Sequence, residues 1–378
     1  MTRTLKVAAI QMDAAPAPLA ERLSRAANLI AESASAGAQL VVLPELFNAG
    51  YEYHDRNYGL AEPVDGETVT WMKRQAAQHG IHLAGSLLLR DEEDVYNAAL
   101  LIAPDGRTWR YDKNFPCLWE RAYFREGRDI TIADTDLGKF GLMICWDTAH
   151  PGMWARYAGK VDAMLIPSCP PKISSADLVF PDGLRVNVSE LGGIWNSLYT
   201  DEEYFPGPDM DEHAAWMGVP MVSTVAGGTF RSRLPLPGVS FPPYLAARPD
   251  LWNRMAQVPD IYLETGYDLQ TKVIGANGLV LARVTSRDDG FAVAEVTLAD
   301  TLPQPEDPQP PMRTSPLAYF TSDVFAASLL TVLYRRGVRQ QWGAHMAPVD
   351  PRTRIWAGGV AAAAAGGLLA GWLTRGRK

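Results

Sequence analysis

The segment Lys139–Asp147 reads KFGLMICWD and sets the interpretation of the whole chain. Its apolar run predicts a buried strand that ends at Cys145 and then turns toward a helix. A cysteine at such a turn presents its thiol, and the backbone N–H of the next residue can donate to a developing oxyanion. Because the thiolate is the reactive form, the site also needs a base or a cation from elsewhere in the chain.

Two other strand ends supply such groups. Glu45 follows the strand predicted over Gln39–Leu43, and Lys113 follows the strand predicted over Arg107–Tyr111. Sheets of α/β proteins place their sites at strand ends, so Glu45, Lys113 and Cys145 form a candidate catalytic group. On spacing alone, a buried inert cysteine and a surface Glu–Lys pair are the alternative.

Strand-like and helix-like segments alternate over about the first 300 residues, which indicates a layered α/β domain. The stretches Lys172–Asp211 and Arg231–Asp268 are rich in Pro, Gly and aromatic residues. We expect them to be irregular insertions that serve as lids, binding loops or oligomer contacts. The predicted helices are Leu19–Ala36 and Thr68–Gln78, and the further strands are Leu5–Met12, Ile81–Leu89, Val95–Ala103, Phe140–Ile144, Ala163–Pro167, Val219–Val225, Lys272–Ile274, Val280–Val284 and Phe291–Val296.

The charge distribution divides the chain into an acidic body and a basic tail. The 378 residues include 35 basic and 43 acidic side chains, a net charge of −8. Residues 1–330 carry 27 basic and 42 acidic side chains, whereas residues 331–378 carry eight and one. Such an acidic body lacks the basic face that nucleic-acid binding requires. Three cysteines without a CxxC pair, and histidines without HExxH spacing, predict neither a disulfide framework nor a metal site.

Four stretches resemble, in order and spacing, the signatures of one family. They are VVLPELFNAGY (Val41–Tyr51), GSLLLRDEEDVYNAALLIAPDGR (Gly85–Arg107), YDKNFPCLWERAYFREG (Tyr111–Gly127) and KFGLMICWDTAHPGMW (Lys139–Trp154). With Asp211–Gly228 and Lys272–Val296, they resemble the nitrilase (carbon–nitrogen hydrolase) superfamily over about residues 5–298, apart from the two insertions. Several ordered motifs make this resemblance specific.

The resemblance implies an α/β fold, the αββα four-layer sandwich of the nitrilase type, with a Glu–Lys–Cys site. Glu45 matches the family's general base, Lys113 its catalytic lysine and Cys145 its nucleophile. Glu120 matches the second glutamate that many members place beside the lysine, although a plain salt bridge is the alternative. The implied chemistry requires no metal and no organic cofactor. Members also form dimers or larger assemblies, so we expect a homo-oligomer.

Three residues are assigned to substrate binding. The backbone N–H of Trp146 is expected to stabilise the oxyanion, Tyr51 lies in the first motif, and Cys169 follows a strand whose loop often borders the substrate in relatives. A packed His150 is favoured over a Cys–His dyad. The aromatic residues of the insertions are expected to pack in the core of the insertions, with an apolar roof over the site as the alternative; these are Trp195, Tyr199, Tyr204, Phe205, Phe241, Tyr244 and Trp252.

The expected activity is that of a thiol amidohydrolase that cleaves an amide or carbamoyl C–N bond through a cysteine thioester. Two departures from the family bear on the substrate. Pro151-Gly152 stands where many relatives have Pro-Glu, and Cys145-Trp146-Asp147 stands where nitrile hydrolases usually have Cys-Trp-Glu. Asp147 favours amides weakly. A true nitrilase, an N-acyltransferase and an inactive scaffold of the same fold remain the alternatives.

The end of the chain predicts a membrane attachment. We expect residues 1–301 to form the catalytic domain, residues 302–316, with six prolines, to form a linker, and residues 317–378 to form a helical tail. Ile355–Leu373 contains 19 residues without a charge, roughly 28 Å as a helix, which is enough to span a bilayer. Arginines before this segment and the lack of a leader place the catalytic domain on the cytoplasmic side. Leu317–Tyr334 is expected to lie in the membrane interface.

Overall fold

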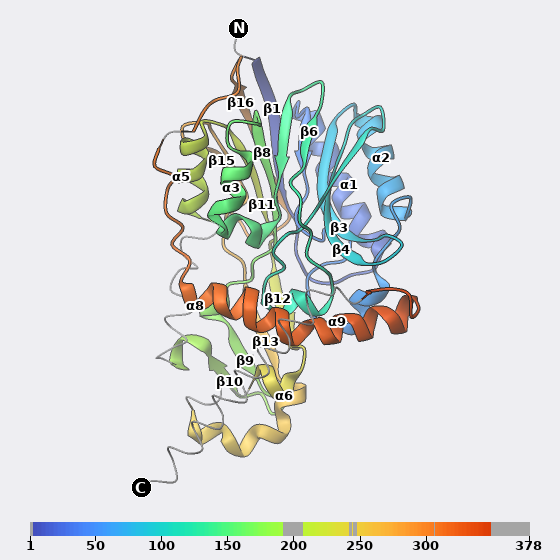
Figure 1. The fold of residues 1–378 in the computed structure, drawn as a ribbon, viewed down its shortest axis with the longest axis vertical. Helices are drawn as coiled ribbons and strands as arrows, with labels where there is room; N and C mark the ends of the chain where they lie inside the picture. Colours follow the sequence, from blue (N-terminus) through green and yellow to red (C-terminus); the bar gives the residue numbers. More distant parts are fainter. Residues whose placement is uncertain (1–2, 192–206, 242–243, 245–247, 306, 349–378) are drawn as a thin grey trace.

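The computed structural model describes residues 3–191, 207–241, 244, 248–305 and 307–348. Two six-stranded sheets pack face to face, and helices cover both outer faces (Figure 1). The expected αββα sandwich is therefore confirmed. Its layers follow from the strand sequences, because strands covered on both faces must be apolar at nearly every position.

The first sheet has the strand order β16-β1-β2-β3-β4-β5. β1, β2 and β3 are parallel, and the other neighbours are antiparallel. Two helices, α1 (Leu19–Ser35) and α2 (Glu67–His79), cover its outer face (Figure 1). The strands are β16 (Gly290–Leu298), β1 (Arg3–Gln11), β2 (Leu40–Val42), β3 (His82–Arg90), β4 (Val95–Ile102) and β5 (Thr108–Asp112).

The second sheet has the order β15-β14-β11-β8-β7-β6, with α3 (Pro151–Tyr157) and α5 (Pro208–Met217) on its outer face (Figure 1). β7, β8 and β11 run parallel, so their carboxyl ends meet at one edge. The strands are β15 (Val280–Arg283), β14 (Lys272–Ile274), β11 (Met221–Val225), β8 (Ala163–Ser168), β7 (Lys139–Leu142) and β6 (Ile132–Asp134).

The strand β1 shows how a single strand supplies side chains to two apolar layers, one on each of its faces. Val7 and Ala9 belong to the cluster between the sheets, whereas Ala8 and Ile10 pack in the cluster under α1 and α2. All four are at most 1% exposed. Because successive side chains of a strand point to opposite faces, an unbroken apolar run fills both layers.

The expectation of irregular insertions is wrong where the structure describes them. They form a third sheet of order β10-β9-β13-β12, which lies beyond one end of the sandwich (Figure 1). Its strands are β9 (Asp177–Val179), β10 (Arg185–Asn187), β12 (Thr229–Ser232) and β13 (Tyr262–Gly266). Strands of three to five residues are too short for alternation to be visible in the sequence. Their pairing also joins segments that are far apart in the chain.

The aromatic roof finds limited support in this layer. Phe241 and Tyr244 are buried in a hydrophobic cluster, whereas Trp252 is 58% exposed. Trp195, Tyr199, Tyr204 and Phe205 lie outside the described residues. The remaining short helical elements are η1 (Asp55–Gly59), η2 (Leu118–Ala122), η3 (Cys145–Ala149), η4 (Ile173–Ser175), η5 (Val188–Leu191), α6 (Pro237–Ser240) and η7 (Pro249–Asp260).

The proline-rich segment lies against the outer face of the second sheet rather than extending from the body. Arg313 is paired with Asp209 and Glu212 of α5, and Gln309 Nε2 donates to Pro151 O at 3.0 Å. A continuous helix follows, in three parts: α8 (Pro316–Tyr319), the π-helical turn η8 (Phe320–Ala326) and α9 (Ala327–Trp342). It crosses the boundary between the sandwich and the third sheet (Figure 1).

This C-terminal helix packs on the body along its length. Tyr334 Oη bonds to Val95 N at 3.0 Å, and Trp342 Nε1 donates to Tyr58 O at 2.8 Å. Gly337 packs closely against the Tyr58 ring. Among the described residues, Pro316–Trp342 is the one helix long and apolar enough to cross a membrane. Ile355–Leu373, the predicted span, lies outside the described residues.

Gly337 offers a test of this packing. A Cβ at Gly337 would stand 2.1 Å from the Tyr58 ring, whereas a Cβ at Gly152 in α3 would meet nothing within 4 Å. Alanine normally stabilises a helix by about 1 kcal/mol over glycine. We expect Gly152→Ala to be neutral or stabilising. Gly337→Ala should lower the midpoint of thermal unfolding and increase proteolysis within residues 316–342. Equal behaviour of the two variants would contradict the tight contact.

Candidate active site

The structure brings the predicted residues of the first sheet together around one ammonium group. Glu45 follows β2, Lys113 directly follows β5, and Glu120 lies in η2. Lys113 Nζ is 2.8 Å from Glu45 Oε1 and 2.7 Å from Glu120 Oε2. These three side chains are at most 1% exposed. A buried charge must be paired, and here one cation is held between two anions.

Cys145 enters the same site from the second sheet. It opens η3 after β7, and its thiol interacts electrostatically with Glu45 and Lys113. Its backbone has a φ of +47°, in the left-handed region that a non-glycine residue adopts at a cost of about 1–3 kcal/mol. Leu46 and Leu118 share this conformation, with φ of +50° and +44°. The three left-handed residues are therefore the candidate nucleophile itself, the residue after Glu45 and the residue two positions before Glu120.

Asp147 holds the turn that presents Cys145. Its Oδ2 accepts from Ile144 N at 2.9 Å and Tyr111 Oη at 2.7 Å, and its Oδ1 accepts from Phe115 N at 2.8 Å. The carboxylate is fully buried, so all of its contacts are made within the fold. Asp147 thus stabilises the turn, and the weak preference for amides that rests on this residue stays a prediction.

Glu45 has the environment of a general base. Its Oε1 accepts from Lys113 Nζ and from Asn97 Nδ2, the latter at 2.7 Å. Its Oε2 has no hydrogen-bond partner among the described residues. Burial raises the pKa of Glu45 to about 7, against the opposing attraction of Lys113. A carboxyl group with such a pKa can accept and return a proton near neutral pH.

The pKa values of Cys145 and Lys113 are shifted in the same direction. Burial and the charge of Glu45 raise the pKa of the Cys145 thiol well above its ordinary value, so the resting thiol is protonated. Burial alone would lower the pKa of Lys113, but Glu120 and Glu45 outweigh it, and the pKa is raised well above the ordinary value. The site thus contains a neutral thiol, a permanent cation and a base that can remove the thiol proton.

Glu120 connects the lysine to the aromatic residues. Its Oε1 accepts from the Tyr51 hydroxyl, and its Oε2 accepts from Cys117 N at 2.6 Å. The Tyr51 ring packs edge-on against Tyr53, with 5.7 Å between the centroids. Tyr51, which the sequence assigns to substrate binding, therefore has its hydroxyl engaged with Glu120.

Cys169 and His150 have different surroundings. Cys169 follows β8, is 1% exposed, and packs in the cluster that contains Tyr51. Its contact with substrate stays a prediction. His150 stacks on Phe115 with 3.5 Å between the ring centroids, and its Nδ1 lies 2.9 Å from Trp146 O. It is a packed histidine, as expected, and its hydrogen bonds do not reach Cys145.

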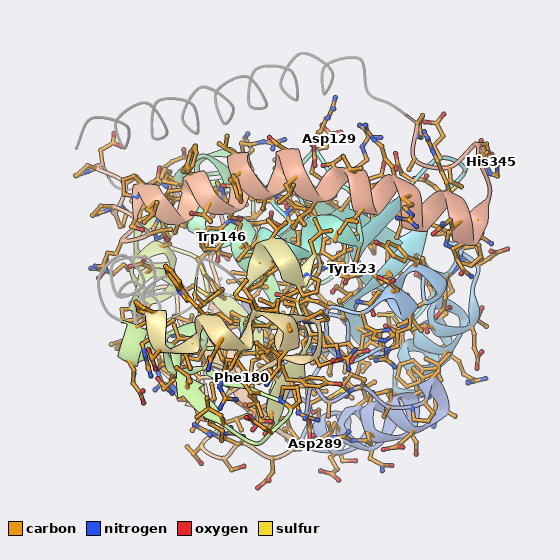
Figure 2. All side chains as sticks on the ribbon, turned by 90° about the horizontal axis from the view of Figure 1, so that it is seen from below. Tyr123, Asp129, Trp146, Phe180, Asp289 and His345 are labelled. Atoms are coloured by element: carbon orange, nitrogen blue, oxygen red, sulfur yellow. The ribbon has the colours of Figure 1, made fainter. Side chains whose placement is uncertain are left out.

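Sequence reasoning missed two residues that contact the site. Asn97 is the one polar residue in the apolar run Val95–Ile102, and that isolation is a signal that could have identified it. Asp323 lies on the C-terminal helix and accepts from Trp146 Nε1 at 3.2 Å. No local pattern links it to Cys145, because 177 residues separate it from Trp146. Figure 2 shows Trp146 close to this helix.

A cavity of about 470 Å³ lies next to the aromatic residues Tyr53 and Tyr123. Its polar and aromatic walls include Tyr53 and Tyr123, and its far side is formed by residues of α9. Tyr53 and Tyr123 stack with 6.4 Å between their centroids. Leu234, Leu236 and Leu333 give the cavity an apolar portion.

Within the residues that the structure describes, no group of His, Cys, Asp or Glu side chains is placed to hold a metal ion.

Comparison with known proteins agrees with this geometry. The model of the carbon–nitrogen hydrolase family matches residues 6–177. The chain is 35% identical over 202 residues to a nitrilase of Pyrococcus abyssi, a match that covers 52% of this chain and 73% of that protein. It is 29% identical over 213 residues to a bifunctional nitrilase/nitrile hydratase of Nicotiana tabacum, covering 50% of this chain and 60% of that one.

Solved structures show the same fold. An amidase from Nesterenkonia sp. AN1, solved with acrylamide added to its active-site cysteine, aligns with a TM-score of 0.55 and 18% identity, covering 77% of this chain and 92% of that one. A superfamily protein from Xanthomonas campestris aligns with a TM-score of 0.56 and 18% identity, covering 79% and 91%. The chain belongs to the carbon–nitrogen hydrolase (nitrilase) superfamily and carries its hydrolase domain.

Proposed function

We propose that the chain is a thiol amidohydrolase that cleaves a non-peptide C–N bond, with Cys145 as nucleophile and Glu45 as general base. One observation carries the proposal: the ammonium of Lys113 is buried between Glu45 and Glu120, and the left-handed Cys145 faces the same charges. A purely structural ion pair would not account for a buried thiol and a base of neutral pKa beside it.

In the first half of the reaction, Glu45 takes the thiol proton and the thiolate attacks the carbonyl carbon. Lys113 and the backbone N–H of Trp146 stabilise the negative charge on the carbonyl oxygen. Glu45 then gives its proton to the leaving nitrogen, the C–N bond breaks, and an acyl thioester forms on Cys145. Glu120, with the Tyr51 hydroxyl, holds Lys113 in position throughout.

In the second half, water attacks the thioester. Glu45 accepts the water proton, and the new C–O bond forms as the C–S bond breaks. The carboxylic acid leaves and the proton returns to the cysteine sulfur, so Glu45 and Cys145 regain their starting states. The low dielectric of a site with side chains at most 1% exposed strengthens each of these interactions.

A second candidate is nitrile hydrolysis, because the relatives in Pyrococcus abyssi and Nicotiana tabacum are named as nitrilases. The same thiolate would add to a nitrile carbon and give the acid and ammonia after hydrolysis. Product analysis on matched amide and nitrile substrates distinguishes the two activities. The lining of the cavity that contains Leu234, Leu236 and Leu333 does not include Glu45, Lys113 or Cys145, so a lipophilic group on the substrate stays a prediction. Assembly into a homo-oligomer stays a prediction.

Cys145→Ala tests the nucleophile. We expect the variant to keep its thermal unfolding midpoint and to lose turnover by at least about 10³-fold, because no other group can form the thioester. Intact-mass measurement on a panel of amides and nitriles should detect an acyl adduct on the wild-type chain and none on the variant. Cys117→Ala is the matched control and should retain the adduct. Turnover by Cys145→Ala would refute the mechanism.

The pH dependence tests Glu45. Protonated Glu45 cannot accept the thiol proton, and burial raises its pKa from 4.5 to about 7. We therefore expect kcat/KM to fall about tenfold per pH unit below about pH 7, as an apparent value of the coupled site. Glu45→Gln should remove activity, whereas Glu21→Gln on exposed α1 should leave the profile unchanged. An acid limb near pH 4.5 would show that Glu45 is not the base.

We also propose that the C-terminal region attaches the enzyme to a membrane. The helix Pro316–Trp342 faces the body with one side, and the opposite side exposes Phe320 (56%) and Val332 (66%). Because the inner side of this helix is packed against the body, the helix is better suited to lie in the membrane interface than to span the membrane. Ile355–Leu373 remains the proposed anchor. The cytoplasmic orientation rests on the arginine bias alone.

Removal of residues 349–378 tests the anchor. We expect the shortened chain to keep its unfolding midpoint and its activity but to lose most co-sedimentation with vesicles, because the uncharged segment is gone. Combining the truncation with Phe320→Ser and Phe325→Ser should remove the residual binding. A chain that ends at Met312 should instead lose stability, since it exposes the surface that α9 covers. Unchanged sedimentation of the chain ending at Pro348 would exclude the anchor.

A further inference from the structure

Asp323 connects the C-terminal helix to the turn that carries the nucleophile. Its Oδ1 accepts from Trp146 Nε1 at 3.2 Å and from Arg121 Nη2 at 3.1 Å, and its Oδ2 lies 2.9 Å from His150 Nε2. The Asp323 side chain is 19% exposed. We propose that Asp323 is a positioning residue of the active site, an inference that rests on the proposed function. Asp323 lies far beyond residues 6–177, the range that matches the family model.

Two of the residues that Asp323 contacts are direct sequence neighbours of residues in the candidate active site. Trp146 directly follows Cys145, and Arg121 directly follows Glu120. One carboxylate therefore fixes the neighbours of the nucleophile and of the glutamate that holds Lys113. His150 provides a second link between Asp323 and Trp146, since its Nδ1 bonds to Trp146 O at 2.9 Å. The bonds reach Arg121 in η2, Trp146 in η3 and His150, which directly follows η3.

The residue before Asp323 makes a second, independent set of bonds to η2. Ser322 Oγ accepts from Leu118 N at 3.0 Å, and Ser322 O accepts from Arg121 Nε at 2.9 Å. Leu118 is one of the left-handed residues, so this bond supports a strained position. On the other turn, the Tyr319 hydroxyl donates to Ala149 O. The segment Tyr319–Asp323 thus holds both catalytic turns.

The local helix geometry suits this role. Phe320–Ala326 forms a π-helical turn within an otherwise α-helical run. π-Helical turns occur mostly as single-turn bulges, frequently at functional sites. Here Ser322 and Asp323, which are adjacent in sequence, both bond to the body. Arg121 is 7% exposed, so the carboxylate also pairs a buried cation.

Loss of Asp323 should therefore displace the turn of Cys145 without removing any reacting group. A displacement of about 1 Å at a catalytic site can reduce the rate about 10²-fold. A residue with only a structural role would lower the unfolding midpoint and leave the rate and the reactivity of Cys145 unchanged. The two roles therefore predict different rates and different Cys145 reactivity for the variant molecules that remain folded.

The experiment compares Asp323→Ala, Asp323→Asn and the control Ser328→Ala in the full chain. Ser328 is partly exposed, and among the described residues its hydroxyl donates to Val324 O of the same helix, at 2.8 Å. Asparagine keeps an oxygen that can accept from Trp146 Nε1, so it should restore part of the geometry without the charge. Each variant is measured for unfolding midpoint, kcat and KM, and the rate at which iodoacetamide alkylates Cys145, followed by peptide mass mapping.

We expect Asp323→Ala to lower kcat by about 10- to 100-fold with KM changed by less than about threefold. Alkylation of Cys145 should slow by about tenfold, because the thiol loses its placement beside Glu45 and Lys113. Asp323→Asn should lie between Asp323→Ala and wild type, and Ser328→Ala should match wild type. Should Asp323→Ala fail to fold, the same comparison is made with Asp323→Asn.

The two measurements separate this inference from the proposed function. Wild type without Cys145-dependent turnover would refute the proposed function, and the alkylation rates would still decide the role of Asp323. Turnover in wild type, together with kcat and alkylation rates of the Asp323 variants equal to those of Ser328→Ala, would refute the positioning role and leave the proposed function standing. Faster alkylation in Asp323→Ala would also refute it, since the turn would then shield Cys145 rather than place it.

Discussion

The ammonium of Lys113, buried between Glu45 and Glu120, is the interaction on which the rest of this structure depends. A cation in a low-dielectric interior is tolerated only when anions meet it at hydrogen-bond distance. Both distances here are below 3 Å. The fold must therefore hold three strand ends and a turn in fixed positions, and the strained backbone at Leu46, Leu118 and Cys145 is a consequence of that demand.

The same charges explain why the thiol needs a base. A cysteine beside a free cation would ionise, but Glu45 and Glu120 neutralise Lys113 before it can act on Cys145 alone. In the proposed mechanism, the thiol stays protonated at rest, and its proton moves only when Glu45 receives it. The developing charge on the substrate carbonyl would then be shared with Lys113.

The parts of the fold and site that the sequence predicts are those set by local pattern. Long apolar runs such as Val95–Ile102 predict the sandwich strands. Glu45, Lys113 and Cys145 lie at or just after predicted strand ends, and the resemblance to the family singles them out. The third sheet escapes prediction because its strands are short and pair across distant segments. Asp323 escapes prediction for a related reason, since its partners are more than 170 residues away and only the packed helix brings them together.

The C-terminal helix has two faces with different surroundings. Its inner face bonds to the turns of Cys145 and Glu120 through Ser322 and Asp323. Its outer face exposes Phe320 and Val332. Close-packed protein interiors transmit strain, so a displacement of this helix would reach the contacts of its inner face. If the outer face binds a membrane, the position of that surface and the order of the catalytic turns are therefore coupled through a single element.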